Sequence, residues 1–177
     1  MSPESLSSKP VSWWAPRATG ISESRGEKNQ QAVKSNKSDI MKLKITAGPF
    51  IFDAVLETAR APKTCEAFIK QMPFDGKIVH VRWSGEGVWI PLGDHDFGVG
   101  YENHTSHPAP GHIILYPGGI SETEILLAYG GVDFSSKMGQ LAGNHFITIT
   151  SNLDQLAEIG RLTLWEGAQS IRFEAVS

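Results

Sequence analysis

The sequence predicts a mainly β protein, a closed β-barrel of about eight short strands with one or two capping helices. From residue 41 onward, short apolar or alternating segments recur, and glycine- and proline-rich turns separate them. Only one segment has a clear helical period. Because full-length helices do not alternate with the strands, a doubly wound parallel sheet is not expected. Closure into a barrel is expected because it removes exposed strand edges.

The first elements of this region are a hairpin and a helix. Residues 42–45 and 49–56 are predicted strands, and Gly48 with Pro49 marks the turn between them. The helix has Pro62 in its first turn and ends at Pro73. Its apolar residues recur at helical spacing, namely Cys65, Phe68, Ile69 and Met72.

The remaining elements are short strands, with one or two helical turns over residues 153–159. Strands are predicted over residues 77–83, 88–90, 112–116, 124–129, 144–150, 161–165 and 170–176. Residues 92–111 are rich in glycine, proline and histidine and have no period. We expect this long loop to border a functional site, because structureless loops beyond about 12–15 residues are usually functional or mobile.

The chain divides into an N-terminal tail and the barrel domain. Residues 1–40 are rich in Ser, Lys, Glu, Gln and Pro and lack an apolar period, so they cannot bury enough surface to offset their ordering entropy. A disordered or loosely docked tail is therefore predicted for residues 1–40, with the adjacent Trp13 and Trp14 as its one unusual feature. Residues 41–177 form the predicted barrel domain.

Composition excludes several classes of partner. The formal net charge of -3 leaves no large basic face for nucleic acid. No run of about 18 apolar residues predicts a membrane span, and the N-terminus has no secretory-signal pattern. Cys65 is the only cysteine, so an internal disulfide and a thiolate zinc site are excluded, and a cytoplasmic location is expected. An exposed barrel face is compatible with a homo-oligomer.

Several segments match one known fold. They are residues 61–68 (APKTCEAF), 80–82 (HVR), 143–147 (GNHFI) and 159–167 (IGRLTLWEG). Together with the order of the elements, they resemble the cyclophilin fold, an eight-stranded barrel capped by two helices, over most of residues 41–177. Residues 111–119 (GHIILYPGG) and 164–169 (LWEGAQ) resemble more closely an uncharacterised bacterial family described as cyclophilin-like. That family implies a fold and no established reaction.

The resemblance implies one candidate activity, peptidyl-prolyl isomerisation. Arg82 would then be the guanidinium donor that weakens the resonance of the X-Pro amide. The chain departs from the cyclophilin pattern at its apolar pocket. Gly87 occupies an aromatic position, Ile147 replaces a phenylalanine, and no tryptophan occurs between Ile147 and Trp165. These departures favour a ligand-binding pocket over an isomerase.

Arg82 is the first candidate for contact with a ligand. In the predicted strand 77–83, Val79, Val81 and Trp83 share one face, and Arg82 lies on the other. If the first set points into the barrel, Arg82 lies on the surface, where it can bind a carboxylate or amide carbonyl with two hydrogen bonds. The alternative is an ordinary surface arginine.

Further candidates lie in the long loop and on the strands. Glu102 and Asn103 offer polar groups to a ligand in an otherwise apolar pocket, or belong to a solvated loop. His145 alternates with Ile147 on a core-facing row, where a neutral, hydrogen-bonded imidazole is common. The full ligand-binding set predicted from sequence is Arg82, Trp89, Glu102, Asn103, Tyr116, Asn144 and His145.

Four histidines within the loop region raise a third possibility, a metal-assisted small-molecule hydrolase or isomerase. They are His95, His104, His107 and His112, beside Asp94 and Asp96. Imidazole and carboxylate suit zinc, iron or nickel, although the spacing fits no standard ligand pattern. The metal candidates are therefore His95, His104 and His107, and no cofactor is predicted. The main hypothesis is a pocket near Arg82 for a small polar molecule, a carboxylate or amide, or for a short peptide.

Overall fold

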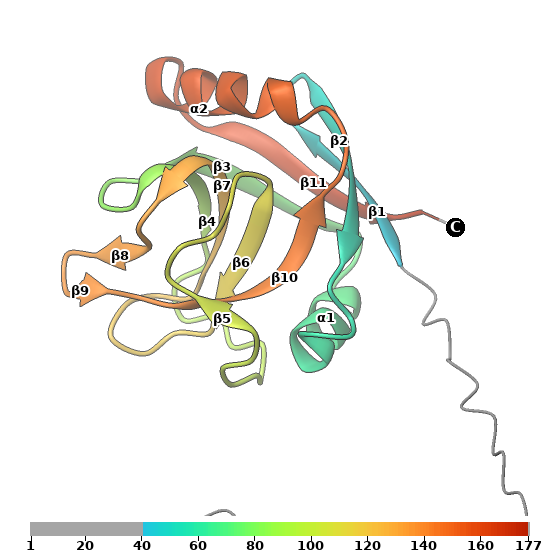
Figure 1. Cartoon of the computed structure of the whole chain (residues 1–177), viewed down its shortest axis with the longest axis vertical. Coiled ribbons are helices and arrows are strands. Elements are labelled where there is room, and N and C mark those ends of the chain that lie inside the picture. Colours follow the sequence, from blue (N-terminus) through green and yellow to red (C-terminus); the bar gives the residue numbers. More distant parts are fainter. Residues whose placement is uncertain (1–40, 177) are drawn as a thin grey trace, which may run out of the picture. The chain divides into compact units, whose positions relative to one another are not determined.

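The computed structural model describes residues 41–176, so the predicted tail over residues 1–40, with Trp13 and Trp14, lies outside the described residues. The described part is an antiparallel β-barrel with two α-helices (Figure 1). Its strands follow the order β2-β1-β11-β3-β4-β7-β6-β10, and a pairing of β10 with β2 closes the barrel. The fold class predicted from sequence is confirmed.

Most elements follow one another along the chain with short connections, and the longest connection, residues 92–103, joins β4 to β5. The strands are β1 (Lys42–Ala47), β2 (Phe50–Leu56), β3 (Phe74–His80), β4 (Gly85–Pro91), β5 (His104–Thr105), β6 (His112–Tyr116), β7 (Glu124–Val132), β8 (Ser135–Ser136), β9 (Gly139–Gln140), β10 (Gly143–Ile149) and β11 (Gln169–Ala175). The helical elements are α1 (Pro62–Ile69), the 3-10 turn η1 (Leu153–Gln155) and α2 (Leu156–Trp165). The helices lie at opposite ends of the barrel (Figure 1).

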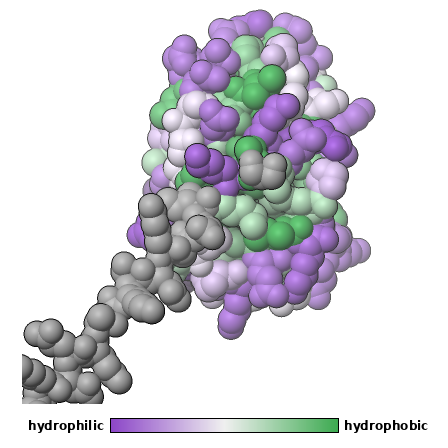
Figure 2. All heavy atoms as spheres, turned by 90° about the vertical axis from the view of Figure 1, so that its right-hand side faces the viewer, coloured by the Kyte–Doolittle hydropathy of each residue, from purple (hydrophilic) through white to green (hydrophobic). Residues whose placement is uncertain are grey.

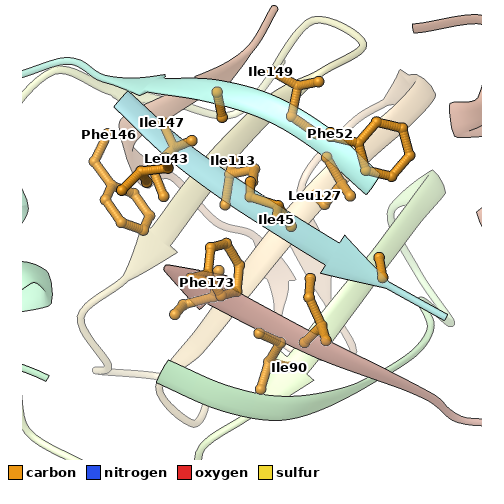
Figure 3. Close-up of a cluster of buried hydrophobic side chains, with 14 of the residues drawn as sticks. Leu43, Ile45, Phe52, Ile90, Ile113, Leu127, Phe146, Ile147, Ile149 and Phe173 are labelled. Atoms are coloured by element: carbon orange, nitrogen blue, oxygen red, sulfur yellow. The ribbon is translucent and has the colours of Figure 1, made fainter. Parts of the chain in front are cut away.

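The barrel interior is a continuous apolar core. Side chains from different strands point toward one another there (Figure 3). Phe68 of α1 closes one end by packing its ring against Phe146 and Phe173, with ring centroids 5.1 and 5.3 Å away. At the other end, Gly160 of α2 lies against the ring of Tyr129, where a larger residue would not fit. Both helices are therefore positioned by aromatic residues of the barrel.

Three sequence predictions about individual elements are wrong. Residues 161–165 are the last part of α2 and not a strand, because Ile159, Gly160 and Thr163 form the buried face of a helix. The strand predicted at 77–83 ends at His80, with Ile78 facing the core, so Val79, Val81 and Trp83 do not point into the barrel. A bulge between His145 and Ile147 breaks the expected alternation of β10, and both Phe146 and Ile147 are core residues.

The surface of residues 41–176 mixes polar and apolar side chains. On the face shown in Figure 2, hydrophilic residues predominate at both ends and hydrophobic residues form separate patches between them. Within residues 41–176, no helix is long and apolar enough to cross a membrane.

Candidate functional site

A cavity of about 290 Å³ lies on the outside of the barrel, beside β4 and β7. The lining residues come from the β3–β4 connection, from β4, from the loop before β7 and from the β8–β9 hairpin. They are Val81, Arg82, Trp83, Ser84, Trp89, Ser121, Glu122, Glu124, Ser135, Ser136 and Lys137. Its volume is near the lower end of the roughly 300–1,000 Å³ that small-molecule pockets occupy.

The cavity exists because β6 and β7 are apolar on both faces. Leu127 points into the barrel core, whereas its neighbours Leu126 and Ala128 belong to a second apolar cluster on the outer face. Phe134 and Leu141, which flank the β8–β9 hairpin, cover this second cluster. The hairpin thus forms a wall outside the barrel, and Val81 and Trp89 pack against the edge of the cluster.

Hydrogen bonds fix the hairpin to the turn that carries Arg82. The Ser84 hydroxyl donates to the carbonyl oxygen of Ser135 at 3.0 Å and accepts from its amide at 3.1 Å. The Asp133 amide also donates to the Ser84 carbonyl at 3.0 Å. Because Ser84 is buried, these bonds hold the two walls of the cavity together.

The basic side chains of the cavity are Arg82 and Lys137. Both are exposed, and neither forms an ion pair with any residue of 41–176. Beside Arg82, Trp83 is 60% exposed, and Trp89 on β4 is half-buried. Two indole rings and an unpaired guanidinium therefore border the same space, a combination that suits a ligand with an apolar body and an anionic group.

Glu124, at the start of β7, is the most unusual residue of the cavity. It is only 7% exposed, and no residue of 41–176 forms a hydrogen bond or ion pair with its carboxyl group. Burial, and to a smaller extent the charge of Glu122, raises the pKa of Glu124 to about 8. The Glu124 carboxyl is consequently protonated at neutral pH in the unliganded protein.

Glu122 and Tyr116 support this part of the wall. A carboxylate oxygen of Glu122 accepts a hydrogen bond from the Gly93 amide at 3.1 Å. Tyr116 lies opposite Glu124 across the β6–β7 pair, and its hydroxyl accepts from the Ile120 amide at 3.1 Å. Tyr116 is 2% exposed, so it holds the loop before β7 in place without lining the cavity.

Three other residues predicted to bind a ligand form a separate polar network around α1. Asn144 is fully buried, its side-chain oxygen accepts from the Glu102 amide, and its nitrogen donates to the Thr64 hydroxyl and to the Gly100 carbonyl. A Glu102 carboxylate oxygen accepts from the Thr64 amide at 2.6 Å, in the first turn of α1. Asn103 donates to the carbonyl of His145 at 2.8 Å. These groups attach the long loop to α1 and β10, and none lines the cavity.

His145 belongs to a third group of polar side chains. Its ring stacks on His112, with centroids 3.8 Å apart and planes at 11°. The Thr148 hydroxyl donates its proton to the Glu57 carboxylate at 2.6 Å, so its oxygen must accept from Nε2 of His145 at 3.0 Å. Burial, and secondarily His112, lowers the pKa of His145 to about 4, which keeps this imidazole neutral.

The histidines predicted as metal candidates lie against different partners. His95 contacts Gln71 at 3.1 Å, His104 packs against Tyr101, and His107 lies 3.6 Å from Asp133. Nowhere in residues 41–176 do three or more His, Cys, Asp or Glu side chains group in a way that would hold a metal ion. The metal-assisted alternative therefore has no geometric support in the part of the chain that the structure describes.

Sequence reasoning missed the acidic side of the cavity and the hairpin residue Lys137. The signal for Glu124 was present, because it opens the otherwise apolar segment EILLA, in which every residue is buried. A strand with both faces covered buries any charged residue within it. Lys137 and the serines of the β8–β9 hairpin had no such signal, since the hairpin reaches the cavity only through the tertiary fold.

The comparisons with known proteins agree with this architecture. Residues 43–175 match the model of a family described as "Protein of unknown function (DUF3830)", and the chain belongs to that family. Among curated proteins, no sequence matches this chain.

Solved structures share the fold at low sequence identity. McbB, determined in complex with tryptophan, has a TM-score of 0.57 at 17% identity, and the match covers 75% of this chain and 44% of McbB. A hypothetical protein of Archaeoglobus fulgidus has a TM-score of 0.51 at 16% identity, with 80% and 99% of the two chains covered. A cyclophilin-type peptidyl-prolyl cis-trans isomerase of Cryptosporidium parvum has a TM-score of 0.50 at 12% identity, with 78% and 98% covered. These likenesses show a cyclophilin-like fold.

Proposed function

We propose that the outer-face cavity binds a small polar molecule through a carboxylate or amide group that Arg82 recognises. The observation that carries the proposal is the unpaired Arg82 guanidinium in a cavity that also contains Trp83 and Trp89. A guanidinium can donate two parallel hydrogen bonds to a carboxylate, and the indole rings supply apolar contact area. McbB, part of which shares this fold, was determined in complex with tryptophan, a small molecule that carries a carboxylate.

The size of the cavity favours a small molecule over an extended peptide. A volume of about 290 Å³ accommodates a ligand of one ring and a few polar atoms. The hairpin and the loop before β7 line the cavity, so a longer chain would have to extend beyond it. We propose that this binding occurs in a reducing, cytoplasmic environment, consistent with the single buried thiol of Cys65.

The test measures the affinity of carboxylates with and without Arg82. Isothermal titration of p-toluate into the wild type should give saturable binding, and Arg82→Ala should weaken it by about tenfold to a hundredfold, the effect of losing a charge-assisted hydrogen bond. Lys63→Ala, which removes an exposed positive charge from α1, is the matched control and should bind as the wild type does. Equal affinity in wild type and Arg82→Ala would refute the proposal.

A peptidyl-prolyl isomerase is the second candidate, favoured by the fold shared with the Cryptosporidium parvum isomerase and by the place of Arg82 just after β3. Against it, Gly87 is buried beneath Val81 and Val132, and Ile147 is a core residue, so neither supplies an aromatic wall for a proline ring. We expect no turnover of a proline-containing peptide above background. Turnover that disappears in Arg82→Ala would establish the isomerase instead.

A further inference from the structure

We propose that the cavity has a second subsite, at Glu124, which takes the positively charged nitrogen of the ligand. The inference rests on the proposed function and deepens it: the ligand would carry an amine as well as the carboxylate or amide bound by Arg82. Its class would then be an amino acid in the broad chemical sense, with a spacing between the two groups that the cavity determines.

The first support is the state of the Glu124 side chain. It lines the cavity, it is more than nine-tenths buried, and its carboxyl group has no partner among residues 41–176. A buried carboxyl without a partner carries a desolvation cost that a ligand donor can offset. Among residues 41–176, no fully buried side-chain oxygen lacks a hydrogen-bond partner, so the Glu124 carboxyl oxygens remain accessible from the cavity, where a ligand donor can reach them.

The second support is the distribution of charge around the cavity. Glu122 and Glu124, two residues apart in the sequence, line one side of the cavity together with Ser121. Arg82 precedes β4, whereas Glu124 pairs in register with Pro91, the last residue of β4. The basic and acidic groups thus approach the cavity from opposite ends of one strand. An elongated dipolar ligand would complement both ends at once.

Each element around Glu124 carries a charged or titratable group. They are Glu122 from the preceding loop, Tyr116 from β6, Arg82 from the β3–β4 connection and Lys137 from the β8–β9 hairpin. None of them forms an ion pair or hydrogen bond with Glu124 within residues 41–176. Within residues 41–176 no cation is paired with the Glu124 carboxylate, so a cationic group of the ligand would be its ion-pair partner.

The test compares carboxylates that differ only in an amine. Three matched pairs span different spacings: L-tryptophan and indolepropionate, ε-aminocaproate and caproate, and p-aminomethylbenzoate and p-toluate. In at least one pair, the amine-bearing member should bind at least about tenfold more tightly to the wild type. Glu124→Gln, which is nearly isosteric, should abolish that advantage, and Glu66→Gln on the exposed face of α1 should preserve it.

The pH dependence gives a second readout with a defined sign. Binding of an ammonium group requires the Glu124 carboxylate, so affinity should rise from about pH 6 to about pH 8 and protons should be released on binding. A ligand that accepts a hydrogen bond from the neutral carboxyl would instead lose affinity over that range. Circular dichroism and thermal unfolding of Glu124→Gln verify that the variant is folded.

Three outcomes overturn the inference, and they distinguish failure of the subsite from failure of the proposed function. If amine-free members bind equally well and still depend on Arg82, the Glu124 subsite does not exist, while the carboxylate site stands. An amine advantage that persists in Glu124→Gln leads to the same conclusion. If no carboxylate of any pair binds, the proposed function fails together with the subsite.

Discussion

Glu124 and His145 have pKa values that differ strongly from those of the same groups in water. Glu124 is a neutral acid in an otherwise apolar strand environment, and His145 is a neutral imidazole stacked on His112. In both, burial is the main cause of the altered pKa. Each shift links the free energy of unfolding to pH with its own sign and its own pH range.

Glu124→Gln should stabilise the protein increasingly as pH rises. The pKa of Glu124 is raised from about 4.5 to about 8 on folding, so the stability that its protonation supports is present at low pH and is lost as pH rises toward 8. Glutamine has no proton to lose, and its advantage near pH 8 should be on the order of a few kcal/mol. Urea unfolding at several pH values measures the difference, with Glu66→Gln as control. A difference that stays flat from about pH 5 to about pH 8 would contradict the assignment.

His145 should make the protein sensitive to acid. Its pKa is lowered from 6.5 to about 4 in the folded state, so the unfolded chain binds more protons between these values and stability falls as pH decreases through that range. The lowered pKa of His112 acts in the same direction. His145→Gln should therefore show a shallower loss of stability below about pH 6.5 than the wild type, measured by thermal unfolding. The exposed His104→Gln serves as control, and equal slopes in all three proteins would disprove the account.

At the scale of elements, α2 is positioned by one close contact with the barrel. Gly160 leaves space for the ring of Tyr129, whose hydroxyl bonds to the His80 ring at 2.8 Å. Gly160→Ala would place a methyl group within that ring and should destabilise the protein by about 1–3 kcal/mol, despite the higher helix propensity of alanine. Gly100→Ala, where nothing lies within 4 Å of an added Cβ, should cost little. Denaturant unfolding of both variants measures the change in the free energy of unfolding. An unchanged midpoint for Gly160→Ala would rule out the contact.

The long loop depends on Asn144 in a comparable way. Its side chain makes three hydrogen bonds that connect Glu102, Gly100 and Thr64. Asn144→Ala leaves the buried Thr64 hydroxyl and the part-buried Glu102 amide and Gly100 carbonyl without this partner, and should cost at least about 2 kcal/mol. Hydrogen exchange of the amides of residues 100–103 should accelerate, whereas the exposed Gln140→Ala should leave it unchanged. Unaltered exchange in Asn144→Ala would show that the loop is held by other contacts.

Elements set by a local sequence pattern were predictable, whereas elements set by tertiary contacts were not. Residues 42–45, which alternate, and residues 112–116, a short apolar run, were predictable as strands because one local pattern decides each of them. Residues 161–165 were not, since β-prone Thr163 and Trp165 resemble a strand until Gly160 packs on Tyr129 and fixes a helix. Periodicity also does not reveal bulges, which is why the facing of β10 was wrong.

The candidate site was predictable only in part for a related reason. Arg82 and Trp89 were identified from the segment around β3 and β4, and both line the cavity. Glu102, Asn103 and Asn144 were predicted to bind a ligand together with Arg82, yet their hydrogen bonds are made within the protein and they do not line the cavity. A sequence shows which polar residues exist, and only the tertiary fold shows which are left unpaired.

At the scale of the whole molecule, the proposed ligand site lies outside the barrel. The interior is occupied by a continuous cluster of apolar side chains (Figure 3). The chain instead builds a second layer on the outer face of β6 and β7 and leaves the cavity at its edge. Ligand binding is therefore expected to affect the β8–β9 hairpin, the β3–β4 connection, the loop before β7 and the lining residues Trp89 and Glu124, and to leave the other barrel strands unchanged.

Chemical-shift mapping tests this central claim most directly. Backbone amide spectra recorded during titration with p-toluate should show perturbations confined to residues 81–84, 89, 121–124 and 135–137, and these should disappear in Arg82→Ala. Perturbations centred on the His112–His145 pair or on the long loop, or none at saturating ligand, would contradict the assignment of the site to the outer-face cavity.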